Sequence, residues 1–249
     1  MDFRQAFISL CAFVAALAGT FAIAMAFAPG ARMRAFARAG ANACLVASAC
    51  AFGYRASYTA RSRVKETREI VQAVNEVTKT NCFELLVYCV IVFGMGTASV
   101  GTKCAACAPL VVVATYQTLA TAHKVLERDG KGMYTKLGFG RVFKSAEANM
   151  ELAMALCATM EISLLTVLCL DLLTKERRSF GRVFAYVQFL RSRYHCEDNT
   201  VYRIKFTAHN VAFYHREVWS TLDAKLFRRL PAGARGRLAF VTRWFTMTQ

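Results

Sequence analysis

Five long apolar runs divide the first 173 residues of this chain, and they constrain its fold more than any other feature. They cover residues 6–28, 39–54, 82–102, 104–122 and 146–173. A membrane-spanning helix needs about 20 residues, because each residue advances the helix by about 1.5 Å. The sequence therefore predicts an all-α, polytopic membrane protein with four or five membrane helices, interfacial amphipathic helices and a basic C-terminal tail.

The overall composition agrees with this fold class. Hydrophobic residues make up 56% of the chain, charged residues only 19%, and the mean hydropathy is +0.32. These values are more apolar than those of average soluble domains. The remaining charge is strongly basic, because 32 Lys and Arg residues against 16 Asp and Glu residues give a net charge of +16. An excess of this size predicts an anionic partner.

Lipid headgroups are the favoured anionic partner for a chain with apolar runs of bilayer length. Each Lys or Arg near an anionic leaflet gains about 1 kcal/mol, whereas no recognised nucleic-acid-binding motif accompanies the basic residues. We therefore expect the protein to bind membrane lipids with anionic headgroups (phosphoinositide, phosphatidylserine or cardiolipin) and other membrane-protein subunits, and not nucleic acid.

The chain is predicted to divide into a membrane helical domain, residues 1–173, and a basic interfacial or aqueous amphipathic tail, residues 174–249. Within the first, apolar residues that recur every three or four positions predict an amphipathic surface helix over residues 62–81. Five full crossings would place this basic helix and the basic tail on opposite sides, which the positive-inside rule disfavours. The run at 39–54 is short and carries Asn42, so we expect it to be re-entrant or interfacial.

Three glycines lie near the junction of the third and fourth apolar runs: Gly94, Gly96 and Gly101. Small residues let two helices approach without a layer of side chains between them. We therefore predict a tight helical hairpin over residues 82–122, in which these glycines pack against another helix.

The tail is the most basic part of the sequence, with nine Lys or Arg residues against two acids between residues 203 and 243. Its apolar residues recur at helical spacing on both sides of a Pro-Ala-Gly break, which predicts two amphipathic helices on the membrane surface or against a partner. Packing on the protein's own body is the alternative. The candidate lipid- or partner-binding residues here and in the motif FAYVQFLRSRY are Tyr186, Gln188, Arg191, Arg193, Tyr194, Arg216, Trp219, Lys225, Arg228, Arg229, Arg243 and Trp244.

Two carboxylates, Glu84 and Glu161, are predicted to lie inside membrane helices, where an ionisable side chain is costly and often functional. Successive acids at Glu151, Glu161 and Asp171 fall on different helix faces, so they form no single proton pathway. A structural hydrogen bond between Glu161 and another helix is therefore favoured. The alternative is a proton- or ion-coupled transporter in which Glu161 faces a water-filled cavity.

No catalytic, cofactor-binding or metal-binding set is recognisable in the sequence. Nine of the ten cysteines lie in apolar runs and are interpreted as small hydrophobic residues. Cys104 and Cys107 have CxxC spacing, but no second pair or nearby histidine accompanies them. We therefore expect a non-enzymatic protein without cofactor or metal.

Four stretches of the sequence resemble one protein family. They are residues 83–127 (FELLVYCVIVF and APLVVVATYQTLATAHKVLE), ATMEISLLTV around Glu161, FAYVQFLRSRY at 184–194, and YHREVWSTL with VTRWF, which begin at Tyr214 and Val241. They resemble the small endoplasmic-reticulum and nuclear-envelope proteins called transmembrane protein thirty-three in animals and pore-membrane proteins in yeast. The resemblance covers residues 82–245 and leaves the N-terminal third unmatched.

This resemblance implies a non-enzymatic protein of the endoplasmic reticulum or nuclear envelope that shapes or stabilises curved membranes. It also implies reticulon-like or pore-associated partners and a membrane role for the C-terminal amphipathic helices, and it carries over no catalytic residue. The alternative is an accessory subunit of a large respiratory or ATP synthase assembly in the mitochondrial inner membrane, where basic pockets would meet cardiolipin.

Overall fold

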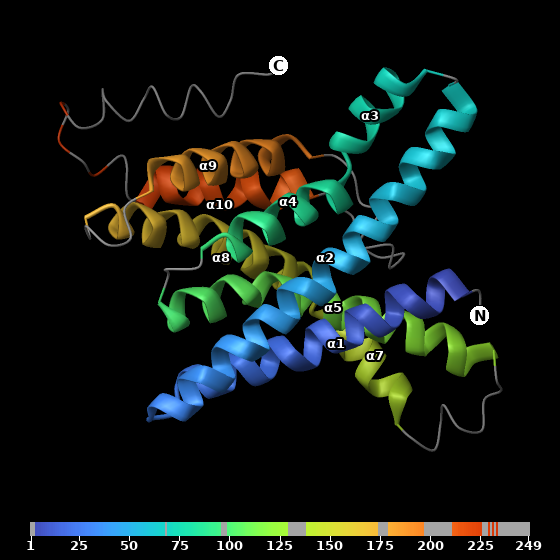
Figure 1. The fold of residues 1–249 in the computed structure, drawn as a ribbon, viewed down its shortest axis with the longest axis horizontal. Helices are drawn as coiled ribbons and strands as arrows, with labels where there is room; N and C mark the ends of the chain where they lie inside the picture. Colours follow the sequence, from blue (N-terminus) through green and yellow to red (C-terminus); the bar gives the residue numbers. More distant parts are fainter. Residues whose placement is uncertain are drawn as a thin grey trace.

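The computed structural model describes residues 3–67, 69–95, 99–128, 138–173, 179–196 and 211–225, with the single residues 229, 231 and 233. Regular structure within these residues is α-helical and includes no strand (Figure 1). The helices are α1 (Phe3–Ala26), α2 (Ala31–Thr67), α3 (Ile70–Thr78), α4 (Asn81–Phe93), α5 (Val100–Arg128), α7 (Phe139–Ala148), α8 (Met150–Asp171), α9 (Phe180–His195) and α10 (Val211–Lys225). Four of them are long and apolar enough to cross a bilayer, so the predicted polytopic helical fold is confirmed.

The four candidate spans are Phe3–Ala26, Ala31–Lys65, Val100–Leu126 and Met150–Asp171. The expectation that residues 39–54 are re-entrant is not met, because this run is the middle of the 37-residue helix α2. At about 1.5 Å per residue, α2 is longer than the bilayer's apolar core of about 30 Å. The short apolar helix is instead α4, which has 13 residues and ends well before the predicted end of the third run.

Helices α1 and α2 form an antiparallel hairpin that packs on α5 (Figure 1). The turn between them contains Pro29 and Gly30, and Gly30 has a φ of 109°, which an L side chain rarely adopts. A Cβ atom on Gly40 would lie 3.0 Å from the Ala18 carbonyl oxygen, so the two backbones are close. The buried residues of α1 are all small: Ala12, Ala15, Gly19 and Ala22. Close packing through small residues therefore occurs at this hairpin.

Two of the three glycines selected from the sequence, Gly94 and Gly101, do not make such contacts. Gly94 is exposed, and a Cβ atom there would meet only carbonyl oxygens of its own helix. Gly101 is exposed too, with Ser99 Oγ at 3.9 Å as the nearest atom to an added Cβ. Gly96 lies outside the described residues. The prediction is wrong for Gly94 and Gly101, because α4 ends at Phe93 and both glycines lie beside the connection to α5.

The single surface helix predicted over residues 62–81 is two helices, because α2 continues to Thr67 and α3 begins at Ile70. Glu69 between them has an extended backbone, which changes the helical phase. As a result Ala73 and Val77 form the buried face of α3, whereas Val71, an apolar residue of the predicted surface helix, is 83% exposed.

Helices α4, α8, α9 and α10 form a second packed group (Figure 1). Helix α8 contacts α5 as well as α9 and α10, and α4 contacts α2 and α9. The C-terminal helices α9 and α10 therefore lie on the body of the protein. For α10 this is the alternative interpretation of the tail, and most of the remaining tail lies outside the described residues.

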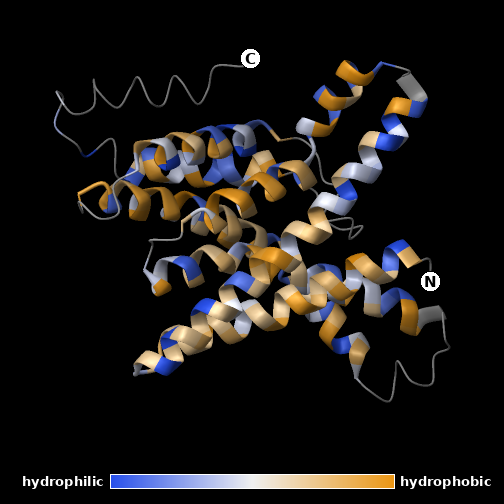
Figure 2. Ribbon diagram, viewed as in Figure 1, coloured by the Kyte–Doolittle hydropathy of each residue, from blue (hydrophilic) through white to orange (hydrophobic). Residues whose placement is uncertain are grey.

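Hydrophobic residues follow α1 and α8, while hydrophilic residues gather toward the two ends of α2 (Figure 2). Several large apolar side chains on the two candidate spans α1 and α8 are exposed in the isolated chain. They are Leu10, Phe13, Val14, Leu17 and Phe21 on α1 and Leu152, Leu156 and Met160 on α8. A bilayer around these helices would cover these side chains.

Candidate functional site

Helices α8, α9 and α10 meet at a buried carboxylate. Glu161, near the middle of α8, is 0% exposed. Arg193 of α9 binds it through two parallel hydrogen bonds, Nε to Oε2 at 2.9 Å and Nη2 to Oε1 at 3.0 Å. His215 of α10 places its Nε2 atom 3.0 Å from the same Oε2. One carboxylate therefore joins three helices, and the predicted interhelical partner of Glu161 is confirmed.

Helix α4 joins the same group of charges through Arg193. The Nη1 atom of Arg193 donates to Asn81 Oδ1 and lies 3.5 Å from Glu84 Oε2. Ser192 Oγ donates to Glu84 Oε1 at 2.5 Å. Four helices thus contribute to one set of buried polar side chains, which we call the buried ionic cluster: Asn81, Glu84, Glu161, Arg193 and His215.

The periodicity of α9 brings Arg193 into the interior. The buried residues of this helix are three or four positions apart and share one face: Tyr186, Phe189, Leu190 and Arg193. The Tyr186 hydroxyl donates to the backbone oxygen of Glu161 at 2.6 Å. Its ring centroid lies 6.1 Å from that of Tyr88 on α4, whose hydroxyl donates to Ala106 O at 2.6 Å. Aromatic side chains therefore surround the cluster and position α4, α8 and α9 around it.

Two carboxylates of the cluster face one guanidinium group. Glu161 accepts the bidentate pair of hydrogen bonds and is the closer counter-ion of Arg193. Burial raises the pKa of Glu84, and the nearby Arg193 charge only partly opposes this effect. The raised pKa of Glu84 reduces the repulsion between the two carboxyl groups, because its neutral form is favoured.

His215 fits the cluster in its neutral form. Burial lowers the pKa of His215, and its contact with Glu161 only partly offsets this effect. A carboxylate only accepts hydrogen bonds, so Nε2 carries the proton that faces Glu161. The Nδ1 atom is buried without a hydrogen-bond partner among the described residues. A second proton on Nδ1 would be unsatisfied there, which also favours the neutral ring.

Two of the residues predicted to bind lipid or partners are interior. Tyr186 is 0% exposed and Arg193 is 1% exposed, and both bind Glu161. The prediction is corrected for these two residues, because a fully buried side chain does not contact a headgroup or a docked protein.

Two other predicted residues, Gln188 and Arg191, line a cleft of about 710 Å³. One wall of this cleft is α9, and the other is formed by α4 and the C-terminal end of α3. Lys79 and His195 also line this cleft, which we call the α4–α9 cleft. Glu84 is the one carboxylate among its described lining residues, and its hydrogen bond to Ser192 connects the cleft to the buried ionic cluster.

The remaining candidates occupy the outer side of α9 and α10. Arg216 donates from Nε to Tyr194 O at 3.3 Å, and its guanidinium carbon lies 5.5 Å from the Tyr194 ring centroid. Trp219 is partly buried against the core, while Lys225 and Arg229 are exposed. The described residues do not include three further candidates, Arg228, Arg243 and Trp244.

Sequence reasoning found the two carboxylates of the buried ionic cluster and missed Asn81 and His215. A signal for His215 is present, because it lies four residues after the buried Val211 and four before the partly buried Trp219. For Asn81 the sequence offers no comparable signal, since it is a polar residue at the first position of α4.

Among the described residues, no three His, Cys, Asp or Glu side chains form a group that could hold a metal ion. The CxxC pair serves helix packing. Cys104 and Cys107 of α5 approach backbone oxygens of α2, with Sγ 3.8 Å from Ala37 O and 3.6 Å from Ala41 O.

The transporter hypothesis requires that Glu161 face a water-filled cavity. Glu161 is instead fully buried, and both of its oxygens accept hydrogen bonds from Arg193. It does not line the α4–α9 cleft. This geometry is that of a link between helices.

One protein-family model, described as Transmembrane protein 33/Nucleoporin POM33, matches residues 8–220. No curated protein and no solved structure matches the chain. The match includes most of α1 and all of α2, where the sequence motifs gave no resemblance, and it ends before VTRWF at Val241. It supports an integral membrane protein and lends no support to the mitochondrial alternative. Because the match covers most of its length, the chain belongs to the Transmembrane protein 33/Nucleoporin POM33 family of endoplasmic-reticulum and nuclear-pore membrane proteins.

Proposed function

We propose that this protein is a non-enzymatic scaffold of the endoplasmic reticulum or nuclear envelope, which docks partner membrane proteins and anionic lipid. The observation that carries the proposal is the bidentate Arg193–Glu161 pair. This pair fixes α9, and with it the basic surface of the C-terminal helices, against the candidate spanning helix α8. The family to which the chain belongs supports the compartment.

The buried ionic cluster suits a scaffold because it specifies one arrangement of helices. Apolar side chains of similar volume would often stabilise a protein as well as or better than a buried ion pair. A cluster that takes partners from α4, α8, α9 and α10 therefore favours a role in fixing geometry. A docking surface built on packed helices is held in place better than one built on loops.

We propose the α4–α9 cleft as the docking site for the protein partner. Its wall carries the basic residues Lys79 and Arg191 and the imidazole of His195. Its carboxylate, Glu84, is already engaged by Ser192 and lies beside Arg193. The cleft therefore complements an acidic segment of a neighbouring membrane protein.

The test is native-gel migration of the tagged full-length protein, extracted from its own membranes in mild detergent. Arg191→Glu reverses a charge in the cleft, and we expect it to shift the protein from a high-mass band to the free form. Arg141→Glu makes the same charge change on an exposed residue of α7 and should leave the band unchanged. Each variant's melting temperature shows whether its fold is intact. Full co-migration of a stably folded Arg191→Glu protein would rule out this cleft.

The compartment is tested in the same cells by fluorescence of the tagged protein. We expect it to coincide with markers of the endoplasmic reticulum or nuclear envelope. Coincidence with a mitochondrial inner-membrane marker would contradict the proposed location, whatever the native gel shows.

A further inference from the structure

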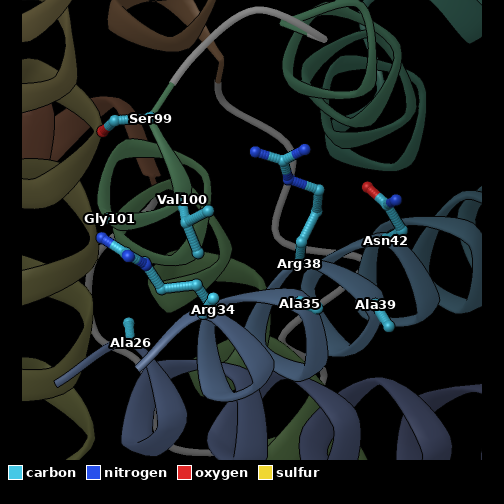
Figure 3. A pocket seen from close by; sticks show the side chains of 10 residues that line it. Ala26, Arg34, Ala35, Arg38, Ala39, Asn42, Ser99, Val100 and Gly101 are labelled. Atoms are coloured by element: carbon cyan, nitrogen blue, oxygen red, sulfur yellow. The ribbon is translucent and has the colours of Figure 1, made fainter. Parts of the chain in front are cut away.

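A second pocket, of about 800 Å³, lies where α1 ends and where both α2 and α5 begin (Figure 3). Ala26 of α1 lines one side, and the first residues of α5, Ser99 to Gly101, line another. From α2 come Arg34, Arg38 and Asn42. This pocket shares no lining residue with the α4–α9 cleft or the buried ionic cluster, so its role is a separate question.

Three basic side chains lie in or next to the pocket, and the described residues place no carboxylate beside them. Arg34 and Arg38 are one helical turn apart, and both side chains extend from α2 into the space beside α5 (Figure 3). Lys103 is buried next to the pocket, where its Nζ atom donates to Asn42 Oδ1 at 3.2 Å and lies 5.9 Å from the Phe93 ring centroid. Both of these partners are neutral. Within the described part of the chain, none of the three cations has a carboxylate at ion-pair distance.

Two helix N-termini add to this positive potential. The first residues of α2 and of α5 both line the pocket. Ser99 Oγ accepts the N–H of Thr102 at 3.0 Å, whereas the N–H groups of Val100 and Gly101 have no acceptor within their helix. Each helix N-terminus carries about half a positive charge. This charge stabilises an anion bound in the pocket and repels the arginine side chains that lie near it. The first turn of α2 holds no acidic residue that would offset it.

The pocket also lies at the level expected for lipid headgroups. One candidate span ends at Ala26, and two others begin at Ala31 and Val100, so three membrane helices terminate around it. Phe27 and Phe36, which follow the lining residues Ala26 and Ala35 in the sequence, are 87% and 54% exposed, and a bilayer would cover such apolar side chains. Basic pockets between membrane helices at this level suit anionic lipid headgroups.

We propose that this pocket binds the headgroup of a phospholipid that carries a phosphate monoester. Arg34, Arg38 and the first N–H groups of α5 contact the phosphate oxygens, and Lys103 adds a buried charge behind them. A phosphate monoester carries about −1.5 to −2 near neutral pH, which matches three cations better than the single charge of a phosphodiester. The site does not depend on partner docking at the α4–α9 cleft.

The test titrates the purified full-length protein in neutral detergent with fluorescent phosphatidic acid and follows fluorescence anisotropy. Arg34→Gln with Arg38→Gln removes both arginines of the pocket and should weaken binding by about tenfold to a hundredfold, since charge-assisted hydrogen bonds to phosphate are lost. Arg61→Gln with Lys65→Gln makes the same charge change at the other end of α2. We expect this matched pair to bind as the unmodified protein does.

Competition distinguishes a lipid from a soluble anion as the ligand. Unlabelled phosphatidic acid should displace the probe, whereas inorganic phosphate and phosphatidylcholine should not at the same concentration. Equal weakening by the two variant pairs would show general attraction to basic residues and overturn the site. Undiminished binding by the Arg34→Gln, Arg38→Gln protein would do the same. Displacement by inorganic phosphate as effective as that by the lipid would overturn the assignment to a phospholipid.

Discussion

Arg193 is charged at any physiological pH, so its position inside a helix bundle requires acceptors on every side. Glu161 takes two of its hydrogen bonds, Asn81 takes another, and Glu84 lies 3.5 Å from Nη1. An unpaired charge in such an interior costs several kcal/mol. The cluster therefore has to be complete in the folded protein, and removal of any one partner exposes that cost.

We expect Glu161→Gln to destabilise the protein by about 3–5 kcal/mol, because Arg193 remains buried without its bidentate carboxylate. The melting temperature of the purified protein in detergent should fall markedly. Glu76→Gln is a matched control, since Glu76 pairs with Arg63 at 3.3 Å on a surface where both side chains are 39–49% exposed. Such an exposed pair contributes about 0–1 kcal/mol. Equal effects of the two substitutions would contradict the assigned role of Glu161.

His215 makes the stability of the protein sensitive to acid. Its pKa is lowered in the folded state by burial, whereas in the unfolded chain it titrates near 6.5. Between the unfolded and folded pKa values the unfolded state binds more protons, so the free energy of unfolding falls as pH falls through that window. The charged groups that face His215 are Glu161 and Arg193.

We therefore expect the melting temperature to drop between about pH 7 and pH 5, and His215→Gln to reduce that drop. The amide of Gln still donates a hydrogen bond toward Glu161 but does not titrate. The readout is the difference in melting temperature between the two pH values for each protein. An identical pH dependence in the variant would show that another group controls it.

Part of this cluster could be predicted from the sequence alone. A carboxylate in the middle of an apolar run requires a partner from another helix, and that inference about Glu161 is confirmed by Arg193. The identity of the partner could not be predicted, because Arg191 and Arg193 both belong to a dense aromatic and basic motif. Only the phase of α9 against α8 places Arg193 inside and Arg191 at the cleft.

At the scale of the elements, the helices were predictable and their ends were not. Apolar runs of bilayer length indicated α1, α5 and α8 because hydropathy alone selects them. The break between α2 and α3 gives no such signal, since residues 66–69 read Glu-Thr-Arg-Glu and contain neither Gly nor Pro. Nothing in hydropathy indicates that α4 ends at Phe93, because the apolar character continues beyond it.

Two glycines, Gly19 of α1 and Gly53 of α2, differ in the space around them, so replacing each with alanine should have opposite effects on stability. A Cβ atom on Gly19 would overlap the side chain of Val111 and lie 2.9 Å from Cys44 Sγ, so Gly19→Ala should destabilise the protein by about 1–3 kcal/mol. Gly53 is also helical, but its added Cβ would meet only the Leu86 side chain at 3.8 Å. Gly53→Ala should therefore stabilise the protein by about 0.5–1 kcal/mol through the lower entropy of its unfolded chain.

Melting temperatures of the two alanine variants in the same detergent check this pair of predictions. Opposite signs support the close approach of α1, α2 and α5 at Gly19. Stabilisation by both substitutions would mean that the three helices are further apart at Gly19 than the structure places them.

At the scale of the whole molecule, the described helices pack into two groups. Small residues hold α1 and α2 against α5, and the buried ionic cluster holds α4, α9 and α10 against α8. Contacts between α5 and α8 and between α2 and α4 connect the two groups. The outer sides of the candidate spans α1 and α8 carry exposed apolar side chains, which a bilayer would cover.

This arrangement predicts which positions meet lipid tails. In a background in which Trp219→Phe and Trp244→Phe remove the native tryptophans, Leu17→Trp and Leu156→Trp place indoles on the exposed faces of α1 and α8. Brominated phospholipids quench tryptophan at short range, so both should be strongly quenched after reconstitution. Tyr88→Trp is the control, because Tyr88 of α4 is 0% exposed and its ring packs against Phe189 of α9. Strong quenching at Tyr88→Trp, or weak quenching at the two leucine positions, would contradict the packing, since the bilayer would then contact a different face of the bundle.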